Sequence, residues 1–214
     1  MSREAEDVPQ THWAVRDARE RSHTTRHSEL LDAAARVFAT RGYAGATAAA
    51  ITAEAGVSRP TFYVYFASCE DIFAALAARV RDDFLAAQQP SSTADTPAEM
   101  LALTVHAFAA AAHTHGPLLT LIEQRAKVDP GIAGLADEIR ERPLRRFTKY
   151  LDLQARSGHI SPTVPHRILA ETIGHTVLRG TIARQHATAQ ERADFESGVI
   201  AVGAQLMGIR PPRG

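Results

Sequence analysis

Residues 47–66 read TAAAITAEAGVSRPTFYVYF, and this stretch decides the fold expected for the N-terminal part of the chain. It contains two short helical segments joined by a three-residue turn, Gly56-Val57-Ser58. Thr47 and Ser58 precede the two segments, where a hydroxyl can accept a hydrogen bond from the first helical turn. Gly56 suits the left-handed backbone with which many helices end. Two helices with such a turn form a helix-turn-helix, whose second helix enters the major groove of DNA.

The second of these helices carries side chains suited to two different faces. Phe62 and Phe66 lie four residues apart, so they share a face and can anchor the helix in its own core. The opposite face and its flank carry side chains that can reach DNA, namely Arg59, Thr61, Tyr63, Val64 and Tyr65. Arginine can bind guanine through two hydrogen bonds, threonine can meet a thymine methyl group, and tyrosine hydroxyls can donate to phosphates. The alternative is a tight helical hairpin with a tyrosine-rich surface.

Helical patterns flank this stretch on both sides. Before it, apolar residues recur at helical spacing and form a stripe of Leu30, Leu31, Ala34, Val37 and Phe38. Gly42 is expected to end that helix. After it, Ser68 begins a capping pattern with an acidic residue, Asp71, three positions later, which opens a fourth helix. The N-terminal region therefore reads as a three-helix helix-turn-helix domain followed by a fourth helix.

The rest of the chain is also predicted to be helical. Residues 88–97 have the composition of a linker, and periodic apolar residues beyond it predict helices over 98–113, 117–127, 132–156, 165–187 and 190–207. The first two of these are separated by the turn signal His115-Gly116-Pro117. No run of alternating β-branched residues indicates a strand. We therefore expect an all-α fold.

Over residues 25–80 the sequence resembles the N-terminal domain of the TetR family of transcriptional regulators. The matching text is residues 30–76, LLDAAARVFATRGYAGATAAAITAEAGVSRPTFYVYFASCEDIFAAL. Its most specific pieces are Phe38, Arg41-Gly42-Tyr43, Thr47, Ile51, Ala55-Gly56-Val57-Ser58, Pro60-Thr61-Phe62-Tyr63 and Tyr65-Phe66. An ordered set of this length is far more specific than a single helix-turn-helix match. The form SRPTFYVYF is similar to an actinobacterial subgroup that includes the repressor of an ethionamide-activating monooxygenase.

The resemblance implies an all-helical homodimer that binds a double-stranded DNA operator and responds to a small-molecule effector. With the helical patterns it gives four segments: a disordered arm over 1–23, a helix-turn-helix domain over 24–68, a helical effector-binding and dimerisation domain over 69–208, and a tail over 209–214. Carried over by position, the DNA-binding residues are Thr47, Ser58, Arg59, Pro60, Thr61, Tyr63, Val64 and Tyr65. No cofactor and no metal are implied.

Two places depart from the family pattern. Family members usually have a lysine that commonly meets a phosphate at the position of Cys69. The first helix of the helix-turn-helix offers Ala48, Ala49 and Ala50, so no long polar side chain reaches the groove from there. Arginines before the domain can compensate, as arms that enter a minor groove do; they are Arg16, Arg19, Arg21 and Arg26. A disordered tail is the alternative interpretation of this arm.

The C-terminal helices are expected to bind an effector and to form a dimer. The resemblance implies a pocket between the 98–113 and 165–187 helices, with candidate ligand-binding residues Leu101, Phe108, Thr172, His175 and Thr176. His175 and Thr176 are the most suggestive, because a buried polar group in an apolar helix needs a partner. A protein partner would satisfy them equally well. The last two helices carry more apolar residues than one layer needs, so two from each chain would form an isologous four-helix interface.

Composition excludes several classes of protein. The 24 Lys+Arg and 24 Asp+Glu residues cancel, which excludes a globally basic protein that coats nucleic acid. A single cysteine excludes a disulfide framework and a multi-cysteine metal site. The sequence shows no signal peptide, no apolar stretch near the ~20 residues of a membrane span, and no enzyme motif such as HExxH or GxSxG. We expect a cytoplasmic regulator that is not an enzyme; the alternative is an effector-less helical DNA-binding or interaction protein.

Overall fold

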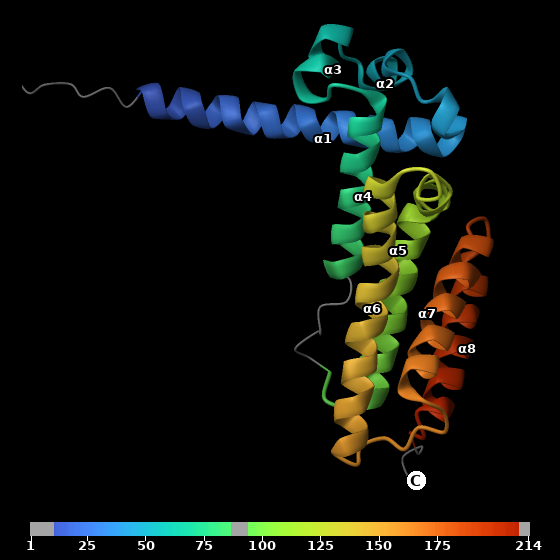
Figure 1. Cartoon of the computed structure of the whole chain (residues 1–214). Helices are drawn as coiled ribbons and strands as arrows, with labels where there is room; N and C mark the ends of the chain where they lie inside the picture. Colours follow the sequence, from blue (N-terminus) through green and yellow to red (C-terminus); the bar gives the residue numbers. More distant parts are fainter. Residues whose placement is uncertain (1–10, 87–93, 210–214) are drawn as a thin grey trace, which may run out of the picture. The chain divides into compact units, whose positions relative to one another are not determined.

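The computed structural model describes the backbone of residues 11–86 and 94–209, and the side chains in these ranges from residue 24 onward. All regular structure in these ranges is helical (Figure 1). The helices are α1 (Thr11–Gly45), α2 (Ala48–Ala55), α3 (Arg59–Tyr65), α4 (Cys69–Ala86), α5 (Pro97–Arg125), α6 (Pro130–Arg156), α7 (His166–Ala183) and α8 (Ala189–Leu206). The predicted all-α fold is confirmed.

The chain divides into two compact units, Met1–Leu76 and Ala77–Gly214. The division falls inside α4, whereas the boundary expected from the sequence, between residues 68 and 69, lay at the start of that helix. The first unit contains α1 to α3 and the beginning of α4, and the second contains the remaining helices.

The N-terminal unit has a core of aromatic rings from α1 and α4. The Phe38 ring centroid lies 4.9 Å from that of Phe73 and 5.8 Å from that of Tyr43. The predicted stripe of α1 is buried along its whole length, which confirms the periodicity (Leu30, Leu31, Ala34, Val37, Phe38). At Gly42 the backbone turns to φ 66°, so the regular helix is interrupted at the residue expected to end it.

Helix α1 begins earlier than the sequence predicted. Residues 11–23, which we expected to belong to a disordered arm, form the first turns of α1, while residues 1–10 lie outside the described residues. The physical reason is that residues 11–41 contain neither glycine nor proline, so nothing interrupts helical hydrogen bonding there. Of the four arginines assigned to the arm, Arg26 has a described side chain, and it pairs with Glu29 of the same helix at 2.9 Å.

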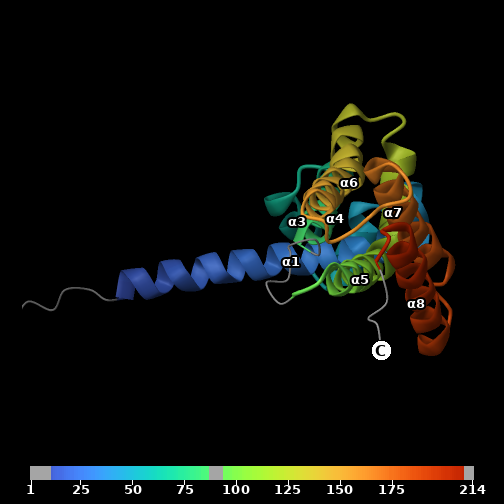
Figure 2. The ribbon, with the colours of Figure 1, turned by 90° about the horizontal axis from the view of Figure 1, so that it is seen from below.

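The C-terminal unit packs α5 to α8 around one apolar core. Helix α7 contacts α5, α6 and α8, and the two views of the ribbon agree on this arrangement (Figures 1 and 2). Leu101, Leu151 and Leu169 of three different helices are fully buried in that core. Helices α7 and α8 approach closely at Gly180, where a Cβ atom would lie 2.1 Å from the Phe195 ring. A larger residue at position 180 would push these two helices apart.

Helix α5 does not end where the sequence predicted. The expected break at residues 115–117 is wrong, because α5 continues to Arg125 with Pro117 inside it. Proline removes a backbone donor and normally disfavours an unbroken helix. Leu118 and Leu119 follow directly and are both buried, so their packing keeps the next turns helical. Tertiary contacts therefore override the local breaker signal.

Replacing Phe38 by alanine is expected to lower the free energy of unfolding of the N-terminal unit by about 3–5 kcal/mol, because it leaves a cavity between the Phe73 and Tyr43 rings. Urea denaturation of the full chain, followed by far-UV circular dichroism, measures this loss. Val64→Ala is the matched control, since Val64 is 70% exposed and its truncation removes little buried area. Equal destabilisation by the two variants would contradict the central place given to Phe38.

Candidate functional site

The helix-turn-helix is shaped by three local signals that the sequence analysis identified. The Ala50 N–H donates to Thr47 Oγ1 at 3.2 Å, and the Thr61 N–H donates to Ser58 Oγ at 3.3 Å. Each bond satisfies a backbone donor that the first helical turn would otherwise leave unpaired. Between the two helices Gly56 has φ 66° and ψ 30°, the left-handed conformation that glycine adopts at least cost. The predicted caps and turn are confirmed.

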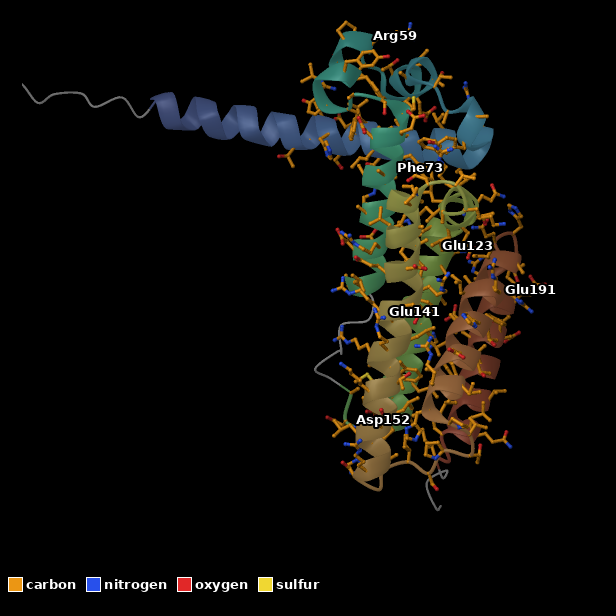
Figure 3. The ribbon with its side chains drawn as sticks, in the orientation of Figure 1. Arg59, Phe73, Glu123, Glu141, Asp152 and Glu191 are labelled. Atoms are coloured by element: carbon orange, nitrogen blue, oxygen red, sulfur yellow. The ribbon has the colours of Figure 1, made fainter. Side chains whose placement is uncertain are left out.

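Helix α3 has one buried and one exposed face. Phe62 is fully buried and Phe66 is 6% exposed, as their spacing predicted. Tyr63 and Val64 are 56% and 70% exposed. Arg59 is also exposed, and Figure 3 shows it at the outer tip of the helix-turn-helix, on the side away from α1. The exposed face is unusual for so short a helix, because large aromatic and aliphatic side chains lie in solvent there.

Three other residues that we expected to bind DNA differ in how far they are exposed to solvent. Pro60 is exposed beside Arg59, whereas Thr61 and Tyr65 are half-buried. The Thr61 hydroxyl lies 2.8 Å from the Ser58 hydroxyl, so these two side chains hydrogen-bond to each other. The Tyr65 ring centroid lies 6.2 Å from that of His27 in α1.

Sequence reasoning missed His27 as a support for α3. Its ring lies 5.0 Å from the Phe66 ring, measured between centroids, so it packs against the end of α3. His27 stands one helical turn before the apolar stripe of α1, three residues before Leu30 and four before Leu31, but it is not apolar and was not counted in that stripe. No signal in the sequence marks this contact, because it joins segments that only the fold brings together.

The charged side chains of the N-terminal unit are distributed unevenly. Arg36 of α1 pairs with Glu54 of α2 at 2.7 Å and ties these two helices together. Within the described residues, no ion pair joins Arg41 or Arg59 to a carboxylate. The guanidinium group of Arg59 is therefore both exposed and uncommitted.

Cys69 has the properties of an ordinary partly buried thiol. Burial, and then the neighbouring Glu70 carboxylate, raise the pKa of Cys69. A raised pKa disfavours the reactive thiolate. No cluster of three or more His, Cys, Asp or Glu side chains gathers in the part of the chain that the structure describes. In the same part, no helix is both long and apolar enough to span a membrane.

The C-terminal unit contains a cavity of about 710 Å³. Its walls come from α5, α6 and α7, with Phe84 of α4 closing part of one side. Four aromatic side chains line it: Phe84, Phe108, Phe147 and Tyr150. The Phe84 and Phe108 rings meet edge to face at 5.2 Å between centroids. A largely apolar cavity of this size is suited to a small organic ligand.

Two of the five residues expected at the pocket line this cavity, and three do not. Phe108 and His175 are part of its wall. Leu101 is instead fully buried in the core, where its side chain meets Gly203 of α8. Thr172 and Thr176 are exposed on α7, outside the lining.

The sequence-based prediction for α7 was wrong about which face of the helix points inward. Ile173 and Val177 point inward and are 5% and 1% exposed, so the neighbouring positions 172 and 176 fall outside. The Thr172 hydroxyl donates to the Ile168 carbonyl of its own helix at 2.8 Å. Because a threonine can satisfy its hydroxyl in this way, a polar residue in an apolar helix did not indicate a buried site. His175 is likewise exposed rather than buried.

Sequence reasoning also missed the wall formed by α6. Its lining residues recur at helical spacing on one face, among them Ile139, Pro143, Phe147 and Tyr150. This stripe was visible in the sequence as an i, i+4, i+8, i+11 pattern, but the pattern is equally typical of a core helix. Burial raises the pKa of the Tyr150 phenol above its ordinary value, since its charged form is poorly solvated there.

Charged side chains stand along the rim of the cavity. Arg179 of α7 binds Glu123 of α5 at 3.0 Å, and Arg140 of α6 binds Asp137 of the same helix. All four side chains belong to the lining. Figure 3 shows Glu123 on the part of α5 that leads to the connection with α6.

A buried histidine that hydrogen-bonds to an exposed carboxylate lies behind the cavity wall. His115 of α5 is 8% exposed, and its Nε2 lies 2.9 Å from Asp83 Oδ2 of α4. The neighbouring residue of Asp83 is Phe84, whose ring lies 6.2 Å from the imidazole. Burial lowers the pKa of His115, with a further lowering from Arg79, and these effects outweigh the raising effect of Asp83. The neutral imidazole, donating from Nε2, is therefore the favoured form.

Acidification is expected to weaken the C-terminal unit through His115. Because the folded pKa lies below the unfolded value of about 6.5, the imidazole favours folding above that pH. The free energy of unfolding falls as the pH drops from about 6.5 through the folded pKa. Denaturation at pH 7.5 and pH 5.5 measures the loss. His115→Gln keeps a donor for Asp83 without titrating, so its pH dependence should be smaller; identical pH dependence in both proteins would contradict this role.

The helix-turn-helix region matches a known family. Residues 30–76, which run from α1 into α4, match the family model for bacterial regulatory proteins of the tetR family. Over these 47 of its 214 residues the chain is similar to the tetR family. Among curated proteins, none matches the sequence.

Solved structures share the fold of this chain well beyond the matched residues. A TetR-like transcriptional regulator from Rhodococcus sp. RHA1 is 22% identical, covers 84% of this chain and 96% of its own, and has a TM-score of 0.64. FadR from Bacillus subtilis, solved with stearoyl-CoA, is 20% identical, covers 86% of this chain and 99% of its own, and has a TM-score of 0.67. The ketosteroid regulator KstR2 of Mycobacterium tuberculosis is 20% identical, covers 83% of this chain and 94% of its own, and has a TM-score of 0.65. At these identities the similarity shows a common fold.

Proposed function

We propose that the protein is a TetR-family transcription repressor that binds a palindromic DNA operator as a homodimer and leaves it when a small, mainly apolar molecule binds. The observation that carries the proposal is the exposed face of α3, with its uncommitted Arg59 and its exposed Tyr63 and Val64. The family match over residues 30–76 supports the same function. Because the operator is chromosomal DNA, we infer that the protein acts in the cytoplasm.

Arg59 is the residue that we assign to base readout. It is exposed at the start of α3 and forms no ion pair within the described residues, so binding DNA breaks no internal salt bridge. A guanidinium group can donate two hydrogen bonds to guanine in the major groove. Pro60 and Thr61, which follow it, would lie against the same base edges.

The remaining polar residues are assigned to phosphate contacts. The Thr47 and Ser58 oxygens already accept from backbone N–H groups, but Thr47 keeps its hydroxyl hydrogen for a phosphate oxygen. Tyr63 presents an exposed hydroxyl, and Val64 and Tyr65 lie at the flank. Phosphate contacts position the helix without reading sequence. The narrower resemblance to the ethionamide-related subgroup stays a prediction.

Arg59→Ala and Tyr63→Ala are expected to affect DNA binding differently. Loss of Arg59 should cost about 1–3 kcal/mol of operator binding and relax the preference at one base pair in each half-site. Loss of Tyr63 should weaken binding to operator and random DNA alike, because it removes a phosphate contact. Gel-shift titrations at one fixed salt concentration, with the DNA upstream of the protein's own gene and with random DNA, measure both effects.

Base readout by Arg59 is refuted if Arg59→Ala weakens operator and random DNA equally. Arg41→Ala is the matched control, since Arg41 is also exposed and unpaired within the described residues but lies outside the helix-turn-helix. Wild-type binding that ignores sequence altogether would favour the alternative, an effector-less helical DNA-binding protein.

We infer that the exposed sides of α7 and α8 form the dimer interface. Ile168 of α7 is 50% exposed and Val202 of α8 is 54% exposed, although both are large apolar residues. Thr172 and Thr176, which do not face the cavity, lie exposed on α7 as well. A second copy related by two-fold symmetry would cover these side chains with the same two helices. This explains the surplus apolar residues of the last two helices.

Val202→Glu is expected to shift the protein from dimer to monomer, because each interface would bury two unpaired carboxylates. Sedimentation velocity measures the oligomeric state, and operator affinity should fall with it. Leu153→Glu on α6 is the matched control, since Leu153 is an equally exposed apolar residue at 60% that lies outside these two helices. If Val202→Glu stayed dimeric, the assignment to α7 and α8 would be wrong.

The effector part of the proposal rests on the cavity of the C-terminal unit. Its volume of about 710 Å³ lies within the range of known small-molecule sites, and its interior is mainly apolar. Two proteins of the same fold are described by their small molecules, FadR from Bacillus subtilis with stearoyl-CoA and KstR2 as a ketosteroid regulator. A ligand that favours the DNA-free conformation would weaken operator binding. Operator DNA would weaken ligand binding by the same factor.

A further inference from the structure

We propose that the cavity takes a single-chain amphipath with an anionic head, such as a long-chain carboxylate, with its head beside Lys127 and its chain extending toward Tyr150. This deepens the proposed function by naming the class of its effector, and it rests on that function only for the link to DNA. Ligand binding itself can be tested without an operator.

The first argument is the shape of the cavity. Along α6 the lining extends from Ala133 to Tyr150, which at 1.5 Å per residue corresponds to a length of about 26 Å. Dividing the volume of about 710 Å³ by this length gives a mean cross-section of only about 27 Å². A long and narrow space of this kind fits one extended chain better than a rigid, fused ring system. Such a chain would contact α5, α6 and α7 together.

The second argument is the gradient of polarity along this space. At the end formed by the C-terminal part of α5 and the start of α6, the lining includes Lys127, Glu123 and Asp137. Toward the other end it includes Met100, Leu103, Phe147 and Tyr150. A ligand that matches both ends must itself be polar at one end and apolar along the rest.

The third argument is the sign of the charge. The lining contains four basic and two acidic side chains, namely Lys127, Arg140, Arg146, Arg179, Glu123 and Asp137. Both carboxylates are already bound, Glu123 by Arg179 and Asp137 by Arg140. No ion pair joins Lys127 or Arg146 to a carboxylate within the described residues. The cavity lining therefore carries more positive than negative charge, so it attracts an anion and repels a cation.

Of the two unpaired cations, Lys127 is the one placed to bind the head. It lies two residues after α5 ends at Arg125 and four residues after Glu123, at the polar end of the space. Arg146 stands on α6 directly before Phe147, about 20 Å further along the helix than residue 133. There its aliphatic stem can border the chain of the ligand while its charged group stays in solvent.

The test compares three probes with the same twelve-carbon chain on the purified full-length protein. Isothermal titration calorimetry below the micelle concentration is run with laurate, dodecanol and dodecyltrimethylammonium. We expect laurate to bind most tightly, at one molecule per chain, and dodecyltrimethylammonium most weakly. Carboxylates from eight to sixteen carbons should bind about fourfold more tightly per added methylene until the space is filled. Equal binding of the three head groups would overturn the anionic assignment.

Two matched variants locate the head group. Lys127→Ala should weaken laurate binding about threefold to tenfold, because an exposed charge pair contributes modestly, and should leave dodecanol binding unchanged. Arg146→Ala removes the other unpaired cation of the same wall and should change laurate binding less than twofold. A loss confined to Arg146→Ala, or equal losses in both variants, would overturn the placement at Lys127. A steroid that binds more tightly than every carboxylate would overturn the single-chain class.

Operator binding separates this inference from the proposed function. Gel-shift titrations with and without laurate are run on the same protein. If laurate binds in a Lys127-dependent way but leaves operator affinity unchanged, the ligand class stands and the effector role fails. If the operator is bound but no carboxylate binds, the DNA-binding function stands and the ligand class is overturned.

Discussion

The burial of Phe62 is the constraint on which the exposed face of α3 depends. Helix α3 has seven residues, and an isolated helix of that length is not stable in water. Tertiary packing therefore has to hold it, and Phe62 is fully buried while the nearby Phe66 is 6% exposed. The ring of His27 closes the end of this contact. Only because one face is fixed in this way can the opposite face present Arg59 and Tyr63 at defined positions.

The N-terminal unit could be predicted well from sequence because its decisive features are local. The caps at Thr47 and Ser58 and the turn at Gly56 each depend on residues within four positions of one another. Side-chain spacing then placed Phe62 inside. The start of α1 could not be predicted in the same way, since a polar segment without glycine or proline is compatible with both a helix and a disordered arm.

The C-terminal unit was harder to predict because its site is made by contacts between distant helices. Apolar periodicity indicates which residues are buried, but it does not distinguish a cavity wall from a packed core. Leu101 of the core and Phe108 of the cavity wall were therefore equally good candidates for the pocket. A threonine that bonds to its own helix, as Thr172 does, gives the same sequence signal as one in a pocket. The pair of His115 and Asp83 joins two helices across 32 positions, and no local pattern marks it.

Pro117 gives α5 a defined mechanical property. Proline has no amide hydrogen, so residue 117 cannot close the backbone hydrogen bond to the carbonyl of residue 113 that the rest of the helix repeats. The side chains on both sides of this step stay packed, with His115 and Leu119 both buried. A helix resists bending chiefly through its backbone hydrogen bonds, and it bends most readily where one of them is missing. Strain applied to either half of α5 therefore concentrates within one turn, directly beside the part of the cavity wall that Leu119 forms.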